Sequence, residues 1–169
     1  MRQDVSELSV AIAGAYKRGN KVLICGNGGL AAESEHFAAE LMGKYGRDLF
    51  IPCFALTTNT SLVTAIANDY GFENVFYHQV KALGKKGDIL IGMTTSASEN
   101  VVKAIDIGFD LDLITVLVCS ENWPSARYQQ LYRTPGTGTA EIQNNIIKFL
   151  HQVALEAKEL AVEDAVRQS

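Results

Sequence analysis

Two residues with the chemistry of metal ligands stand one helical turn apart at His36 and Glu40. A four-residue spacing puts both side chains on one face of a helix. An imidazole nitrogen next to a carboxylate oxygen is a common start of a zinc site. The same face could be solvated instead, because Glu33 and Glu35 make this stretch rich in acidic side chains. The pair taken alone leaves both interpretations open.

A second pair of possible ligands lies near the other end of the chain. Gln143 and His151 are eight residues apart, a little over two helical turns, so they share a helix face that also carries Ile147. A histidine in an apolar helix is more often a hydrogen-bonded core residue than a ligand, and both roles stay open for His151. His78 has no comparable companion, and we predict that it lies at the surface.

A glycine-rich turn precedes the helix that carries the first pair. Residues 22–25 form an apolar run of strand length, and Gly26, Asn27, Gly28 and Gly29 follow directly. The pattern predicts a buried strand that breaks into a tight loop and presents free backbone N–H groups at a helix N-terminus, where phosphate binds well. The loop lacks the lysine of a P-loop and does not fit GxGxxG, so it does not predict a nucleotide-binding fold.

Hydroxyl groups gather in a second loop. Thr94, Thr95, Ser96 and Ser98 follow another apolar run and precede a helical pattern. Their hydroxyls match the acceptor oxygens of a phosphate, and the following helix adds backbone N–H donors. The alternative is a solvated turn that caps the next helix.

Strand and helix patterns alternate along the whole chain. The alternation implies a parallel sheet with right-handed crossovers, an α/β fold built as a three-layer α/β/α sandwich with a flavodoxin-like sheet. In such sheets ligands bind beyond the carboxyl ends of the strands, so we expect the two polar loops to converge on one site. The predicted helices cover 5–18, 31–41, 61–67, 74–83, 101–107 and 139–162, with a break at 68–71, and the predicted strands cover 22–25, 50–56, 88–93, 113–119 and 130–133.

Composition narrows the class of protein. The 169 residues are 47% hydrophobic, enough to bury one core, and we expect 1–169 to be a single domain. The net charge of -4 comes without a basic cluster, which argues against nucleic acid as the main partner. The sequence offers neither a membrane-length apolar run nor a signal peptide, so we expect a cytoplasmic protein without a membrane partner. Cys25, Cys53 and Cys119 are widely spaced in apolar strands, and we predict reduced core thiols.

Together, these motifs resemble the phosphoheptose isomerases of the SIS (sugar isomerase) type, which convert sedoheptulose 7-phosphate to D-glycero-D-manno-heptose 7-phosphate. The resemblance runs from about residue 21 to residue 151. It is carried by Cys25-Gly26-Asn27-Gly28-Gly29, His36-Phe37-Ala38-Ala39-Glu40-Leu41, Ala67-Asn68-Asp69-Tyr70-Gly71-Phe72, Thr94-Thr95-Ser96-Ala97-Ser98, and Ile142-Gln143 with His151.

The resemblance implies a metal cofactor and a set of site residues. One zinc ion would be held by His36, Glu40, Gln143 and His151, and Glu40 and His151 would handle the protons of an enediol-type aldose–ketose isomerisation. The phosphorylated sugar substrate would contact Asn27, Gly28, Gly29, Asn68, Asp69, Thr94, Thr95, Ser96, Ser98 and Gln143. The resemblance further implies a homo-oligomer, expected to be a tetramer, with the first and last helices packed across a subunit interface.

Several positions depart from the family's pattern. Leu30 and Thr94 stand where the family usually has serines, and Lys44 stands where it has an arginine. Ala140 replaces an acidic residue and Glu141 an arginine, which would bring negative charge near a phosphate. These changes leave the four proposed zinc ligands intact and alter the substrate pocket, so the substrate could differ from sedoheptulose 7-phosphate.

Three functions compete at this point. The first is a zinc-dependent aldose–ketose isomerase that acts on a sugar phosphate. The second is a non-catalytic SIS module that binds a phosphosugar or a protein partner, but such relatives tend to lack the acid–base pair, and Glu40 and His151 are both present here. The third is a lyase or etherase that acts on another sugar phosphate.

Overall fold

A parallel sheet forms the centre of the molecule in the computed structural model, which describes residues 2–120 and 127–167. Within these residues the strands lie in the order β2-β1-β3-β4-β5, and each neighbouring pair is parallel. This order confirms the predicted flavodoxin-like fold class. The strands are β1 (Val22–Cys25), β2 (Cys53–Ala55), β3 (Ile89–Thr94), β4 (Ile114–Ser120) and β5 (Gln130–Thr134).

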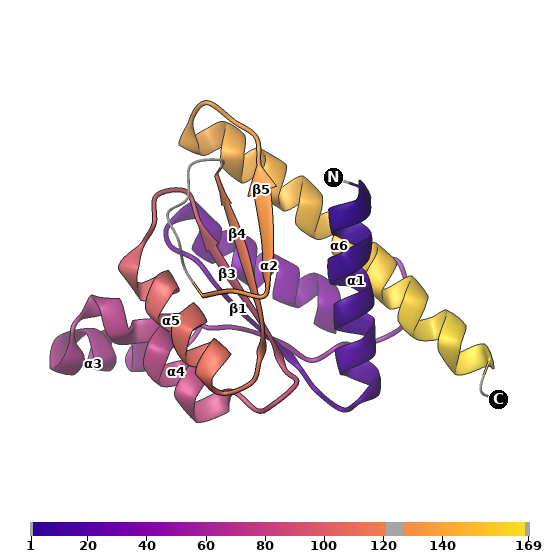
Figure 1. The fold of residues 1–169 in the computed structure, drawn as a ribbon, viewed down its shortest axis with the longest axis horizontal. Helices are drawn as coiled ribbons and strands as arrows, with labels where there is room; N and C mark the ends of the chain where they lie inside the picture. Colours follow the sequence, from indigo (N-terminus) through magenta and orange to yellow (C-terminus); the bar gives the residue numbers. More distant parts are fainter. Residues whose placement is uncertain (1, 121–126, 168–169) are drawn as a thin grey trace.

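Helices cover both faces of the sheet and complete the three layers (Figure 1). The helices α1, α2 and α6 pack on one face, and α3, α4 and α5 pack on the other. Their bounds are α1 (Arg2–Lys17), α2 (Gly29–Met42), α3 (Thr60–Tyr70), α4 (Val75–Leu83), α5 (Glu99–Asp110) and α6 (Thr139–Arg167), with a short 3₁₀ turn η1 (Phe72–Asn74) before α4.

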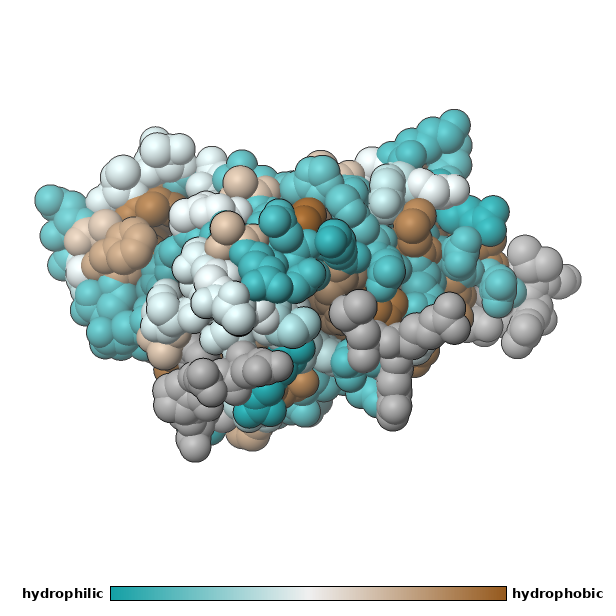
Figure 2. Space-filling view, turned by 90° about the horizontal axis from the view of Figure 1, so that it is seen from above, coloured by the Kyte–Doolittle hydropathy of each residue, from teal (hydrophilic) through white to brown (hydrophobic). Residues whose placement is uncertain are grey.

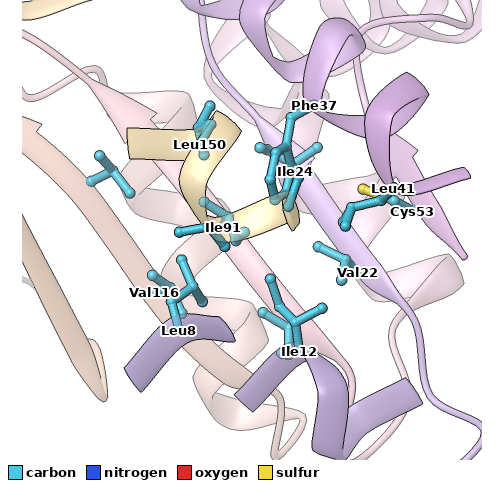
Figure 3. Close-up of a cluster of buried hydrophobic side chains, with 14 of the residues drawn as sticks. Leu8, Ile12, Val22, Ile24, Phe37, Leu41, Cys53, Ile91, Val116 and Leu150 are labelled. Carbon is cyan, nitrogen blue, oxygen red and sulfur yellow. The ribbon is translucent and has the colours of Figure 1, made fainter. Parts of the chain in front are cut away.

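The strands are apolar along their length because both of their faces are buried. On β1, Val22 and Ile24 point to the cluster beneath α1, α2 and α6, while Leu23 and Cys25 point to the cluster beneath α3, α4 and α5. Figure 3 shows the first cluster, in which Ile24 lies close to Phe37 of α2. This packing fixes α2 directly after β1, and therefore fixes the helix that carries the candidate ligands.

The helices α1 and α6 lie side by side and share their apolar faces within the chain (Figure 1). Leu8 and Ile12 of α1 and Leu150 and Val153 of α6 are fully buried in one cluster. We expected these faces to pack across a subunit interface, but the structure uses them within the chain. These apolar faces are therefore not available for a contact between subunits in this conformation.

Several predicted boundaries were wrong. Asn68 and Asp69 do not break α3, which continues to Tyr70 and ends where Gly71 adopts a positive φ of 90°. The strand β2 is shorter than predicted because Pro52, which has no N–H to donate, precedes it. The last helix runs beyond the predicted end at residue 162 to Arg167.

Cys25, Cys53 and Cys119 are buried and free, which confirms the prediction of core thiols. Burial raises the pKa of the Cys25 thiol to about 12 and that of Cys119 to about 11. The thiols are therefore protonated packing groups. In the described part of the chain, no helix combines the length and apolarity needed to cross a membrane.

Candidate active site

Two polar loops meet where the strand order of the sheet reverses. The strands β1 and β3 are neighbours at this point, which is where doubly wound sheets bind ligands. Asn27, after β1, and Asn100, at the start of α5, exchange two side-chain hydrogen bonds of 2.9 Å. The predicted convergence of the loops is confirmed, and the sequence did not single out Asn100 as the residue that joins them.

A cleft of about 250 Å³ lies beyond the carboxyl ends of these strands. It brings together most of the predicted substrate-binding residues, and Leu30, Met93 and Thr139 complete its lining. The predicted residues that line it are Asn27, Gly28, Gly29, Thr94, Thr95, Ser96, Ser98 and Gln143.

Glycines shape one wall of the cleft. Gly28 precedes α2 with φ 57° and ψ -122°, a conformation that L side chains rarely adopt. At Gly29 a Cβ would lie only 2.7 Å from Nε2 of Gln143, so the glycine allows the amide of Gln143 to rest on the backbone. Because α2 begins here, the positive end of its helix dipole lies at the cleft. The first-turn N–H groups of Leu30, Ala31 and Ala32 are not free, as the sequence had suggested, because they donate to the carbonyls of Asn27 and Gly28.

The hydroxyl-rich loop is held in shape by its own buried threonine. Oγ1 of Thr94 accepts hydrogen bonds from the N–H groups of Ser96 and Ser98, both at 3.2 Å, and lies 3.3 Å from the Ser98 hydroxyl oxygen. Ala97 takes a left-handed φ of 55° to close the turn. Thr94 therefore organises the loop, while the exposed Ser96 is free to contact a ligand.

The predicted ligands from α2 and α6 meet as a triangle of donor atoms. Nε2 of His36 lies 2.9 Å from Oε1 of Glu40 and 3.0 Å from Nε2 of His151. Nε2 of His151 lies 3.0 Å from the same Glu40 oxygen. The alternative in which His151 is a core residue was wrong, because 37% of its side chain is exposed and its ring nitrogen faces the other two donors.

The triangle fits a metal ion of the size of zinc. A tetrahedral ion with bonds of about 2.0–2.1 Å spreads its ligand atoms about 3.3 Å apart, so the three donors need to open only slightly. Oε2 of Glu40 is buried and has no hydrogen-bond partner among the described residues. A buried carboxylate without compensation is costly, and a bound cation would supply the missing charge. Imidazole with carboxylate is a donor set that zinc shares with other transition ions.

Gln143 lies in the cleft, with its amide against Gly29. Gly29 precedes His36 by seven residues, about 10 Å along the axis of α2. Among the described residues, His36, Glu40 and His151 bring their donor atoms together, and Gln143 lines the cleft. The cleft and the triangle are neighbours along the seam between α2 and α6.

Two polar residues near the triangle, Tyr45 and Lys158, were missed by the sequence analysis. The ring centroids of Tyr45 and His151 are 5.9 Å apart, and burial together with the Glu40 charge raises the pKa of Tyr45. Lys158 is fully buried on α6; burial lowers its pKa, and the charges of Glu40 and Asp48 oppose this effect. A helical-face argument would have found Lys158, which follows His151 by seven residues.

Glu33 stands one turn before His36 on α2. Burial raises the pKa of its carboxyl to about 7, and the charge of His36 lowers it in part. One of its oxygens, Oε2, is buried without a hydrogen-bond partner among the described residues. The acidic face considered in the sequence is therefore only partly solvated, because both Glu33 and Glu40 are drawn into the protein.

Some predicted residues lie outside the cleft. Asn68 and Asp69 are exposed at the end of α3, where the Asn68 amide donates to Asp69 at 2.8 Å. His78 lies at the surface and is partly exposed, and the centroid of its ring is 4.5 Å from that of Tyr70 and 5.4 Å from that of Tyr77.

Glu141 does not line the cleft either. Its carboxylate accepts hydrogen bonds from the N–H and the hydroxyl of Thr137, and these bonds lower its pKa. The charge that was expected to disturb a phosphate is thus turned toward the loop before α6. Leu30, in contrast, does line the cleft, with its side chain buried in the apolar cluster.

Comparison with known proteins agrees with this geometry. Residues 2–120 match the model of the SIS domain family, so the chain belongs to that class of proteins. A phosphoheptose isomerase of Aliarcobacter butzleri is 41% identical over 159 residues, which cover 90% of this chain and 83% of the relative.

Solved structures of phosphoheptose isomerases are also similar. The enzyme from Francisella tularensis has a TM-score of 0.88 at 29% identity, and the match covers 93% of this chain and 86% of that enzyme. The enzyme from Neisseria gonorrhoeae has a TM-score of 0.80 at 35% identity, and the match covers 90% of this chain and 84% of that enzyme. Within the SIS domain proteins, the chain belongs to the phosphoheptose isomerase family, and it is an aldose–ketose isomerase of sugar phosphates.

Proposed function

We propose that the protein is a zinc-dependent isomerase that interconverts sedoheptulose 7-phosphate and D-glycero-D-manno-heptose 7-phosphate. The observation that carries the proposal is the meeting of His36, Glu40 and His151 next to a polar cleft at the switch point of the sheet. The similar curated proteins are named phosphoheptose isomerases, which supports this substrate class.

The phosphate of the sugar binds in the cleft in this proposal. The N-terminus of α2 offers the positive end of a helix dipole, and Ser96 and Ser98 offer hydroxyls from the facing loop. With the phosphate held there, the sugar chain extends along the seam between α2 and α6, which brings C1 and C2 to the triangle. Gln143 lines the path between the two ends and is the fourth proposed zinc ligand.

The reaction moves a proton between C1 and C2 through an enediol. Glu40, the buried member of the triangle, takes the proton from one carbon and returns it to the other. His151, half-exposed at the mouth of the site, exchanges a proton with the sugar oxygens as they change between carbonyl and hydroxyl. Bound zinc would polarise the carbonyl oxygen and so make the neighbouring carbon more acidic. His36 serves as a ligand only.

Asn68 and Asp69 remain part of the proposed substrate site, although they do not line the cleft within one chain. Their exposure at the end of α3 is compatible with a site completed between chains. We accordingly propose a homo-oligomer, expected to be a tetramer. Figure 2 shows hydrophobic side chains in separate patches on one face, and exposed Val10 and Phe50, at 58% and 57%, are candidates for contacts between subunits.

The cytoplasm is the proposed location of the enzyme. Cys25, Cys53 and Cys119 are free, as expected in a reducing compartment. The small phosphorylated substrates proposed here are intermediates of metabolism in that compartment.

Sedimentation of the purified protein as a stable monomer at micromolar concentration would count heavily against the proposed oligomer.

The test of the proposed function uses Glu40→Gln and His151→Ala. Each general acid–base group contributes about 10²–10⁴-fold to the rate, so each variant should lose measurable turnover and bind less zinc. Interconversion of the two heptose phosphates is followed by NMR, with zinc content and unfolding temperature measured on the same samples. His78→Ala, which removes a histidine outside the site, is the control. If both site variants keep wild-type turnover, the proposed roles are wrong.

A further inference from the structure

Lys158 is a cation buried beside the candidate metal site. Its exposed fraction is 0%, and it is among the largest fully buried side chains of the described residues. Nζ of Lys158 donates a hydrogen bond of 2.5 Å to the carbonyl oxygen of Gly43. Gly43 caps the C-terminus of α2, three residues after Glu40. The ammonium group therefore lies at the C-terminus of the helix that carries Glu40.

The hydrogen-bonding capacity of Lys158 and Glu40 is complementary. An ammonium group has three N–H donors, and the Gly43 carbonyl accepts from one of them. Oε2 of Glu40 is buried and has no donor among the described residues. The charge of Glu40 acts favourably on the Lys158 ammonium. The two groups form no direct ion pair in the described part of the chain, so in this structure they interact through their charges and not through a hydrogen bond.

Packing alone does not explain a lysine at this position. Removing an ammonium group from water costs several kcal/mol, and a hydrophobic side chain of similar volume often replaces a buried charge without loss of stability. A methionine could fill the same space between α2 and α6, and the carbonyl of Gly43 could then be hydrogen-bonded by water or by another donor. The charges of Glu40 and Asp48 both favour the Lys158 ammonium, and Glu40 is the buried carboxylate of the two.

We infer that Lys158 is a positioning residue for Glu40. Its positive charge compensates the buried carboxylate, whose Oε2 has no donor among the described residues, and so favours the conformation in which Oε1 is directed at His36 and His151. Carboxylates that bind metals are themselves held by hydrogen bonds from the surrounding protein. The inference rests on the proposed metal site for its consequence, but the link between Lys158 and Glu40 can be tested without metal.

The first experiment measures zinc affinity by competition with a chromophoric chelator. Lys158→Met keeps the length of the side chain and removes its charge, and we expect the affinity to fall about 10–100-fold. Lys158→Arg keeps the charge and should stay within a few-fold of wild type. Lys148→Met makes the same change at an exposed site on α6 and should not alter the affinity. Lys158→Met with wild-type affinity would overturn the inference.

The second experiment is a double-mutant cycle on the metal-free protein. The unfolding temperatures of Glu40→Gln, Lys158→Met and the double variant are compared with that of wild type. We expect each single change to lower the unfolding temperature, because it leaves one buried charge uncompensated, and the double variant to lose less than the sum. Additive losses would contradict the inference.

The cycle also separates this inference from the proposed function. A wild-type protein that binds no zinc contradicts the proposed metal site, while coupling in the metal-free cycle still decides the relation between Lys158 and Glu40. If Lys158→Met alone does not fold, the double variant, which is neutral at both positions, should recover folding. Its failure to do so would refute the link.

Discussion

The amide of Gln143 rests on the backbone of Gly29, so that a Cβ at position 29 would lie 2.7 Å from its Nε2 and 2.8 Å from its Oε1. Gly29 is the first residue of α2, and Gln143 lies in the second turn of α6. The contact joins the two helices at the end that faces the cleft. The other end of the same seam holds the triangle of His36, Glu40 and His151.

Gly29→Ala should therefore damage the site more than the fold. The backbone of Gly29 is helical and alanine favours helices, but the new methyl group would push Gln143 away. We expect the KM for the sugar phosphate to rise about 10-fold or more, with an unfolding temperature near that of wild type. Steady-state kinetics and thermal unfolding measure both effects. Gly138→Ala, where a Cβ would meet no atom within 4 Å, is the matched control.

Metal removal should lower both activity and stability. A ligand that binds only the folded state stabilises it by about 2.7 kcal/mol at 100 times its dissociation constant. Dialysis against a chelator should therefore abolish turnover and lower the unfolding temperature, and added zinc should restore both. The triangle predicts that Glu40→Gln loses most of the zinc-dependent gain in unfolding temperature. A protein that keeps full activity after its metal content falls to zero would refute this prediction.

The link between Asn27 and Asn100 should control the shape of the cleft. Asn100 is buried, and Asn100→Ala leaves the side chain of Asn27 without the partner for two hydrogen bonds. We expect a loss of about 1–3 kcal/mol in the free energy of unfolding and a raised KM. Denaturant unfolding and kinetics test both. Asn145→Ala removes a single hydrogen bond to the Pro135 carbonyl and should leave KM unchanged.

The fold could be read from the sequence because local and global signals agree. The apolar runs at 22–25, 88–93 and 113–119 became buried central strands, as their continuous hydrophobicity predicted. The errors concern ends of elements. Asn68 and Asp69 are poor helix formers, but the following Gly71, at a positive φ, is what ends α3. Tertiary packing overrides such weak preferences.

The candidate site was predictable where spacing on a helix determines it. His36 and Glu40 share a helix face, and the meeting of this face with His151 needed only that α2 and α6 pack together. Asn100 and Tyr45 were missed because their roles arise from contacts between distant segments. Lys158 shares a helix face with His151, and only its bond to the Gly43 carbonyl needed the structure. A periodicity identifies the buried face of a helix, but it does not identify the side chain that faces it.

The half-buried carboxyl of Glu33 makes stability depend on pH in a direction opposite to that of most carboxylates. Its pKa is about 7 in the folded protein and near 4.5 in an exposed chain, so the folded state binds the proton more tightly. The free energy of unfolding should therefore fall as the pH rises from about 4.5 to about 7. Above that range the full destabilisation by the buried, ionised carboxylate is present.

Glu33→Gln removes the ionisable group and should reveal this cost. We expect the free energy of unfolding of the metal-free variant to exceed that of metal-free wild type by about 1 kcal/mol at pH 8. This figure allows for solvent screening at a half-buried site, and the difference should be much smaller at pH 5. Denaturant unfolding at both pH values measures the difference, and Glu33→Met, which also lacks the charge, should show the same trend. The metal-free protein is used because a bound cation near His36 would itself stabilise the Glu33 carboxylate. An equal advantage of both variants at pH 5 and pH 8 would show that the effect comes from packing and not from the buried charge.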